Sequence, residues 1–146
     1  MAVSVQGMLK TQVEGSAGCA TVTVCRWPAP AGTVLPVLVL VGPIVTDHAR
    51  SRGRGDAWYG PLVTETWEAR LFTDRDDADQ DVLPRRVLAA LDGGTAGSLD
   101  GVALFDTRVT AGPEWQDPVA PADALADGVD EYRFRVEVSF EDRIAP

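Results

Sequence analysis

Histidine, cysteine and lysine are scarce in this chain of 146 residues, which has one histidine, two cysteines and one lysine. With His48 as the only imidazole, a Ser-His-Asp triad would have to be built beside a glycine-rich segment, and a histidine-rich zinc site is excluded. Cys19 and Cys25 lie six residues apart, which makes neither a disulfide framework nor a zinc site. We interpret both as small, half-buried free thiols in a reducing compartment.

Long hydrophobic runs are also missing. The most apolar stretch covers residues 34–45, about half the length that crosses a bilayer, and it contains Pro36 and Pro43. The first ten residues lack the basic start and the apolar run of a signal peptide. The sequence therefore predicts a buried strand at this place and no membrane partner.

Catalytic signatures are absent from the sequence. No G-x-S-x-G, H-E-x-x-H, P-loop or G-x-G-x-x-G pattern occurs. The formal net charge of −9 disfavours specific nucleic-acid binding, because such surfaces need clustered Lys and Arg. We predict a protein that is not an enzyme and that has no cofactor.

The acidic stretch over residues 74–81 invites a calcium hypothesis, because its five aspartates imitate the alternating acids of a calcium-binding loop. The stretch lacks the central glycine, and Arg85 stands where the bidentate glutamate belongs. We therefore predict no metal site here, but a solvated acidic start to a helix, where negative charge suits the helix dipole.

What the sequence has most clearly is alternation near its end. Over residues 132–140, aromatic or valine side chains alternate with charged or polar ones, which is typical of a strand with one buried face. Weaker patterns of the same kind occur earlier, separated by Gly and Pro. The expected elements are a helix over 2–14, strands over 20–27, 36–46 and 62–72, a helix over 74–92, a strand over 101–111 and the closing strand over 132–140.

Four details of this assignment can be tested. The helix over 2–14 should bury Val5, Met8, Leu9 and Val13. The strand over 36–46 is apolar on both faces and should be covered on both, with a bulge or bend at Gly42-Pro43. Glu65 interrupts an apolar face and suggests proximity to a sheet edge. Pro84 should kink or divide the helix over 74–92, and Gly93-Gly94 should end it.

This order of elements predicts a single α+β domain over residues 1–146. We expect a four- to five-stranded, mainly antiparallel or mixed sheet with two helices packed on one face. Two loops are expected between strands, over residues 47–60 and 112–128. Because loops carry contacts more often than buried strands do, both are candidates for binding. The candidate contact residues in them are Arg50, Arg52, Arg54, Trp58, Tyr59 and Trp115.

With these elements placed, the chain resembles the tail terminator, or tail completion, proteins of long-tailed bacteriophages. The matching features are the Pro-rich crossover WPAPAGTVLPVLVL, the strand TETWEARLF, the helix ending RRVLAALDGG and the closing strand YRFRVEVSF. They occur in the family's order and cover nearly the whole chain. The resemblance implies a structural virion protein at the tail-neck junction, made in the host cytoplasm, that forms a homohexameric ring on the head-proximal end of the tail tube.

The resemblance also implies the partners: further copies of this chain, the tail tube protein and a head-closure or connector protein, with the genome passing through the lumen. Two alternatives stay open. One is another neck component, such as a head-closure or connector protein. The other is a small cytoplasmic ligand-binding domain or enzyme that uses the acidic helix start.

Overall fold

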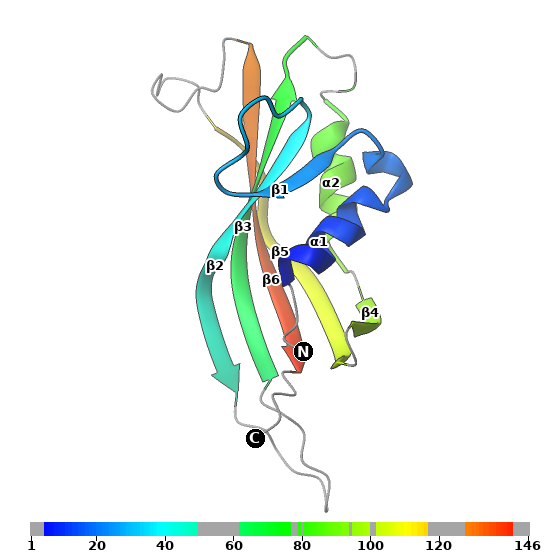
Figure 1. Ribbon diagram of the computed structural model, residues 1–146, viewed down its shortest axis with the longest axis vertical. Coiled ribbons are helices and arrows are strands. Elements are labelled where there is room, and N and C mark those ends of the chain that lie inside the picture. Colours follow the sequence, from blue (N-terminus) through cyan, green and yellow to red (C-terminus); the bar gives the residue numbers. More distant parts are fainter. Residues whose placement is uncertain are drawn as a thin grey trace, which may run out of the picture.

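The computed structural model describes residues 5–49, 62–76, 79, 81–93, 95–99, 102–116 and 128–141. One sheet runs through these residues in the order β1-β2-β3-β6-β5-β4, and two helices lie together on one side of it (Figure 1). Every neighbouring pair is antiparallel except β1 and β2, which are parallel. The predicted α+β class with a mixed sheet is confirmed. The elements are α1 (Val5–Glu14), a 3-10 turn (Ala17–Cys19), β1 (Thr23–Arg26), β2 (Val37–Ala49), β3 (Leu62–Asp74), α2 (Leu83–Leu91), β4 (Thr95–Leu99), β5 (Val102–Gln116) and β6 (Val129–Glu141).

Helix α1 buries the face that its spacing predicts. Val5, Met8, Leu9 and Val13 are all buried, and they join one core with α2 and the covered face of the sheet. Both α1 and α2 contact this same core, so the sheet has a helix-covered face and an opposite face without any described helix (Figure 1). We call the opposite side the open face.

Strand β1 is shorter than predicted, because residues 20–22 form a turn after the 3-10 segment. Strand β2 continues to Ala49, past the predicted end. Its register against β3 shifts between Val41 and Val45, which confirms the predicted bulge at Gly42-Pro43. The prediction that both faces are covered holds for residues 37–40 and is wrong further on, since Ile44 and Val45 are exposed. The covering elements do not reach this half of the strand.

Strand β3 is longer than predicted and lies between β2 and β6. The inference that Glu65 marks a sheet edge is therefore wrong. Glu65 lies on the helix-covered face, where its Oε2 accepts a hydrogen bond of 2.8 Å from the indole nitrogen of Trp67. A carboxylate is tolerated at this interior position because the neighbouring indole supplies a donor.

The prediction of a helix over 74–92 is wrong in its first half. Asp74 ends β3, residues 75 and 76 form a turn, and α2 begins only at Leu83. Pro84 lies in the first turn of α2, where its missing N–H costs no helical hydrogen bond, so it starts the helix instead of kinking it. Gly93, with φ of 71°, follows the end of α2, in agreement with the predicted stop.

The sheet has one strand more than expected, because β4 was not predicted. Strand β5 is longer than the predicted 101–111 and continues to Gln116 through two register shifts, one at Thr110 and one at Gly112-Pro113. The predicted loop over 112–128 is therefore wrong for residues 112–116. Trp115 lies in a strand and not in a loop, and residues 117–127 lie outside the described part of the chain.

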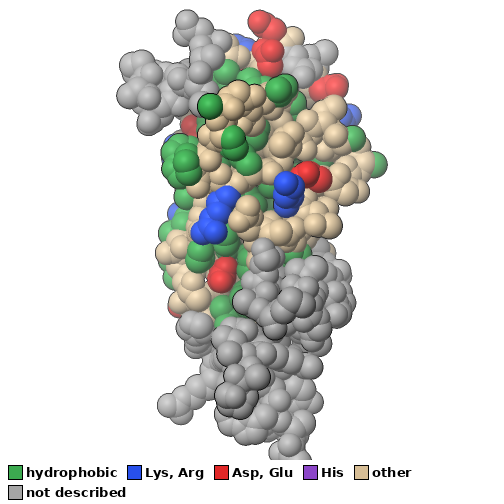
Figure 2. Space-filling view, in the orientation of Figure 1, with side chains coloured by type: hydrophobic (Ala, Val, Ile, Leu, Met, Phe, Trp, Pro, Cys, Tyr) green, Lys and Arg blue, Asp and Glu red, His purple; other side chains and the backbone are tan. Residues whose placement is uncertain are grey.

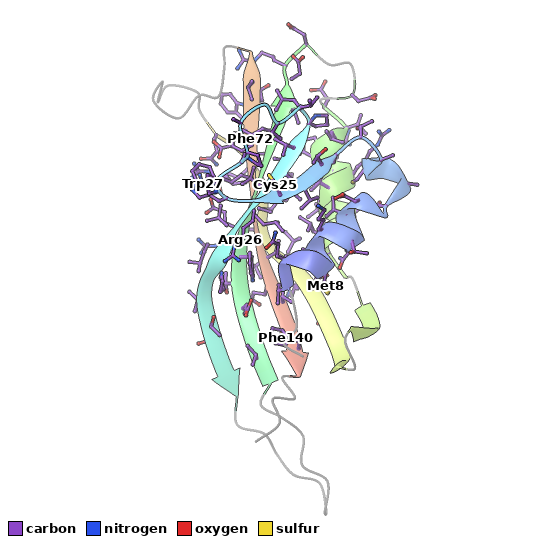
Figure 3. The ribbon with its side chains drawn as sticks, viewed as in Figure 1. Met8, Cys25, Arg26, Trp27, Phe72 and Phe140 are labelled. Carbon is purple, nitrogen blue, oxygen red and sulfur yellow. The ribbon has the colours of Figure 1, made fainter. Side chains whose placement is uncertain are left out.

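The closing strand is confirmed as β6, with the predicted alternation. Phe134, Val136, Val138 and Phe140 are buried, and Tyr132 is half-buried. Figure 3 shows Phe140 near one end of this strand and Met8 of α1 nearer the middle of the sheet. The helix-covered core thus runs along β6, which pairs with β3 on one side and β5 on the other.

Candidate interaction surfaces

The structure places only one of the predicted contact residues. Arg50, Arg52, Arg54, Trp58 and Tyr59 lie outside the described residues. Trp115 is described, and half of its surface is exposed. The prediction that Trp115 is available for contact is consistent with this exposure, although its setting is a strand.

Trp115 belongs to a small polar cluster at one end of the sheet. The carboxylate of Asp130 is buried and accepts hydrogen bonds from Arg75, at 2.9 Å from Nη2 and 3.2 Å from Nε. The indole nitrogen of Trp115 lies 3.4 Å from the same Oδ1. The contact with Asp130 raises the pKa of the Arg75 guanidinium, first through the hydrogen bond and then through charge. The contact with Asp130 orients the indole nitrogen inward, and half of the Trp115 surface stays exposed at this end of the sheet.

The open face carries a ladder of opposite charges in its middle. Arg70 Nε lies 2.6 Å from Glu68 Oε1, and Arg133 Nε lies 3.1 Å from Glu131 Oε1. The two pairs are cross-linked, since Arg70 approaches Glu131 and Arg133 approaches Glu68, both at 3.9 Å. Such partly exposed pairs contribute at most about 1 kcal/mol each. Their effect here is to neutralise one another, so this part of the face presents polarity with little net charge.

Aromatic side chains lie beside this ladder. Trp27, just after β1, is 53% exposed, and the Arg70 guanidinium stacks 5.1 Å from its ring centroid. Figure 3 shows Trp27 at the margin of the molecule, above Arg26. On the covered face, the guanidinium of Arg26 lies 5.7 Å from the ring of buried Trp67. An exposed Trp held by a guanidinium is the kind of side chain that anchors protein interfaces.

Among the described side chains on the face that Figure 2 shows, charge is mixed and no region of one sign dominates. In Figure 2, basic and acidic side chains are scattered among apolar and neutral ones. Among the described residues, no group of three or more His, Cys, Asp or Glu side chains is arranged to hold a metal ion. No described helix is long and apolar enough to cross a membrane.

Both cysteines are free thiols, as predicted. Cys19 is buried more completely than expected, while Cys25 is half-buried, beside Phe72. Burial is the main cause that raises the pKa of each thiol above that of a free cysteine. A raised pKa keeps the thiols protonated near neutral pH, which is the opposite of what a catalytic cysteine needs.

Sequence reasoning missed Trp27 and the exposed pair Ile44 and Val45. The predicted strand over 20–27 ends at Trp27, and its neighbour Pro28 already indicates that the chain leaves the sheet there. For Ile44 and Val45, the available signal was Gly42-Pro43, which marks the point where regular packing on β2 ends.

No protein-family model matches this chain. No curated protein matches it significantly.

Proposed function

We propose that this chain is a structural protein of a long-tailed bacteriophage that forms a ring on the head-proximal end of the tail tube. In this role it ends tube polymerisation and joins the tail to the neck. The work of such a protein is binding through several faces at once, so the relevant properties are its sheet, its edges and its exposed side chains.

The observation that supports the proposal is the order of the elements. The resemblance implies a short N-terminal helix, a strand, a Pro-rich crossover, an apolar strand and then a strand, a helix, a strand and a closing strand. The chain has α1, β1, the crossover, β2, β3, α2, β5 and β6 in that order, with β4 added before β5. The agreement holds even though the boundaries of α2 and β5 differ from those predicted.

The arrangement of layers also suits a ring component. Both helices pack on one face (Figure 1). Ala29 and Leu35 of the crossover pack on one end of the open face, over Val37, Val39 and Phe72, and among the described residues the rest of that face has no helix on it and is available to meet other molecules. Exposed Trp27 and Trp115 lie on separate parts of the molecule, and each is held by an arginine or a carboxylate. The net charge of −9 is compatible with a lumen through which DNA slides without binding.

Negative-stain microscopy of the purified protein, combined with native mass measurement of the same sample, tests the proposal. We expect rings with a central hole and a mass six times that of the chain. A neck component that is not a terminator would also assemble, and it would be distinguished by adding purified tail tubes, which a terminator caps at one end only. A protein that stays monomeric alone and also fails to bind tubes would contradict the proposal.

A further inference from the structure

Within the described residues, much of the outer side of β2 has no strand beside it. Strand β1 pairs with β2 only over residues 37–40. Just beyond, the Trp27 N–H donates to the Leu40 carbonyl at 2.9 Å, and the Arg26 guanidinium donates to the Gly42 carbonyl at 3.0 Å. Past Gly42, no described residue pairs with the outer side of β2. We call the outer side of residues 44–49 the β2 edge.

The register shows which backbone groups point outward from the β2 edge. Successive residues of a strand direct their backbone groups to opposite neighbours. The Leu40 carbonyl points toward β1. The backbone groups of Val39 and Val41 therefore point toward β3, where these residues pair with Arg70 and Glu68. On β3, even-numbered residues therefore face β2.

The same alternation continues past the bulge. Thr66 and Thr64 face β2, and their partners are Val45 and Asp47, which therefore face inward. Thr46 lies between these two, so by the same alternation its backbone N–H and carbonyl point away from β3. The backbone of His48 points outward for the same reason.

The bulge at Gly42-Pro43 precedes the β2 edge, but the edge itself carries little of what usually protects a free strand. Residues 44–49 contain neither lysine nor proline, and Asp47 is their only charged residue. Ile44 and Val45 are 47% and 48% exposed, so apolar surface flanks the unpaired backbone. Natural edges are normally short, charged, bulged or covered, because an open apolar edge pairs with another strand.

The opposite margin of the sheet ends in β4. Its five residues, TAGSL, contain no charge and no proline. On β5, the Thr107 carbonyl accepts a hydrogen bond from the Gly93 N–H, and the Val109 N–H donates one to the Asp92 carboxylate. The backbone groups of odd-numbered β5 residues therefore point away from β6. Ala96 and Ser98 of β4 pair with the odd-numbered Phe105 and Ala103, so they face β5. The backbone of Gly97 therefore points outward.

The β2 edge and β4 lie opposite each other across the sheet, at the two ends of the same rows of residues that pair from strand to strand. One row runs from Asp47 through Thr64, Ser139 and Asp106 to Thr95. The next runs from His48 through Val63, Phe140 and Phe105 to Ala96. The pairings also make β2 and β4 run in the same direction. A second copy placed beside the first, in the same orientation, therefore brings its β4 to the β2 edge.

We propose that the β2 edge accepts strand β4 of a second copy of this chain, in parallel, and that repetition of this junction links the copies head to tail. The inference rests on the proposed ring and names its interface. Each junction uses the β2 edge of one copy and the β4 edge of the next copy. A row of joined copies therefore keeps one free β2 edge at one end and one free β4 edge at the other, and these can pair to close the ring. Pairing of two β2 edges would instead stop at a dimer and leave β4 unpaired.

Proline substitutions test the two edges separately. Thr46→Pro removes the outward backbone N–H of residue 46, because proline has no N–H. The hydrogen bonds between β2 and β3 stay intact, since residue 46 makes none of them. Thr46→Ala is its matched control, since it removes the same side chain and keeps the N–H. Gly97→Pro and Gly97→Ala form the corresponding pair on β4. We expect each proline variant to weaken each junction about tenfold or more and to lose the ring, while both alanine variants assemble.

Mixing the two proline variants identifies the junction. Thr46→Pro keeps a working β4, and Gly97→Pro keeps a working β2 edge, so an equal mixture can form one junction and no more. We expect a heterodimer by native mass measurement, with each variant monomeric when measured separately. Circular dichroism and the melting temperature of each monomer establish that it is folded. If a proline variant is unfolded, Thr46→Lys and Gly97→Lys replace the pair, because an edge lysine opposes strand addition.

Other results would overturn this inference. If wild-type protein forms rings and both folded proline variants form them too, the proposed function stands and these two edges are not the interface. Loss of rings in Thr46→Pro alone, with Gly97→Pro assembling normally, would exclude β4 as the occupant. Wild-type protein that forms no ring alone or on tail tubes would remove the inference together with the proposed function.

Discussion

The side chain of Gln12 joins three elements that are far apart in the sequence. Its amide nitrogen lies 2.6 Å from the Ala90 carbonyl, 3.3 Å from the Leu91 carbonyl and 3.0 Å from the Thr107 hydroxyl. It therefore ties α1 to the end of α2 and to β5. Carbonyls at the end of a helix have no helical partner, so a donor from outside satisfies groups that would otherwise need water.

Gln12→Met tests this contact at the scale of a single residue. Methionine has a similar length and removes both donors, leaving the carbonyls without this partner in a half-buried site. We expect the free energy of unfolding to fall by about 1–3 kcal/mol. Chemical denaturation followed by circular dichroism measures this change.

Gln6→Met is the matched control for Gln12→Met. Gln6 is half-buried on the same helix, and the same substitution there removes none of the three contacts. We expect a change within about 0.5 kcal/mol, as is usual away from such features. Equal losses in the two variants would mean that helix α1, and not the amide of Gln12, accounts for the effect.

At the scale of elements, the sequence predicts best where one periodicity persists. The alternation over 132–140 fixed both the existence and the buried face of β6, and the apolar spacing of Val5, Met8, Leu9 and Val13 did the same for α1. Both patterns follow from side chains that must face one core, so local sequence and global fold agree.

The misjudged elements are those whose pattern is interrupted by Gly or Pro. Pro84 predicts a kink within the helix over 74–92, whereas its fixed φ and missing donor place it at the start of α2. Gly112 followed by proline predicts the start of a loop, whereas β5 accommodates the pair in a bulge and continues to Gln116. The β2 edge could not be predicted, because whether a strand has an outer neighbour depends on sheet order.

Gly112 itself gives a prediction at this scale. Its φ of 101° is disfavoured for other residues, and an added Cβ would press against the carbonyl of Arg133 and the Cα of Phe134 on β6. Gly112→Ala should therefore lower the free energy of unfolding by about 2–5 kcal/mol, from backbone strain together with the clash. Thermal and denaturant unfolding measure the loss.

Gly93→Ala separates strain from clash. Gly93 also has a positive φ, of 71°, but an added Cβ there meets nothing within 4 Å. We expect a cost of about 1–2 kcal/mol, from the conformation alone. A Gly112→Ala variant that is no less stable than Gly93→Ala would show that the bulge in β5 shifts away from β6 at little cost.

At the scale of the whole molecule, charge opposes assembly. Each copy carries a formal net charge of −9, so copies gathered in a ring repel one another. The proposed junction joins β4, which has no charged residue, to residues 44–49, which have only Asp47. The attraction between edges therefore comes from backbone hydrogen bonds and apolar contact, which salt does not weaken in the way that it screens charge pairs.

We therefore expect salt to favour the ring. Raising the ionic strength from about 0.1 M to about 1 M shortens the Debye length from about 10 Å to about 3 Å, which screens the repulsion between copies. Sedimentation velocity across this range should show the ring population increasing with salt, while Thr46→Pro stays monomeric throughout. Rings that dissociate as salt is added would contradict this expectation. Such a result would assign the interface to pairs of opposite charge, for which the ladder of Glu68, Arg70, Glu131 and Arg133 on the open face would be the first place to look.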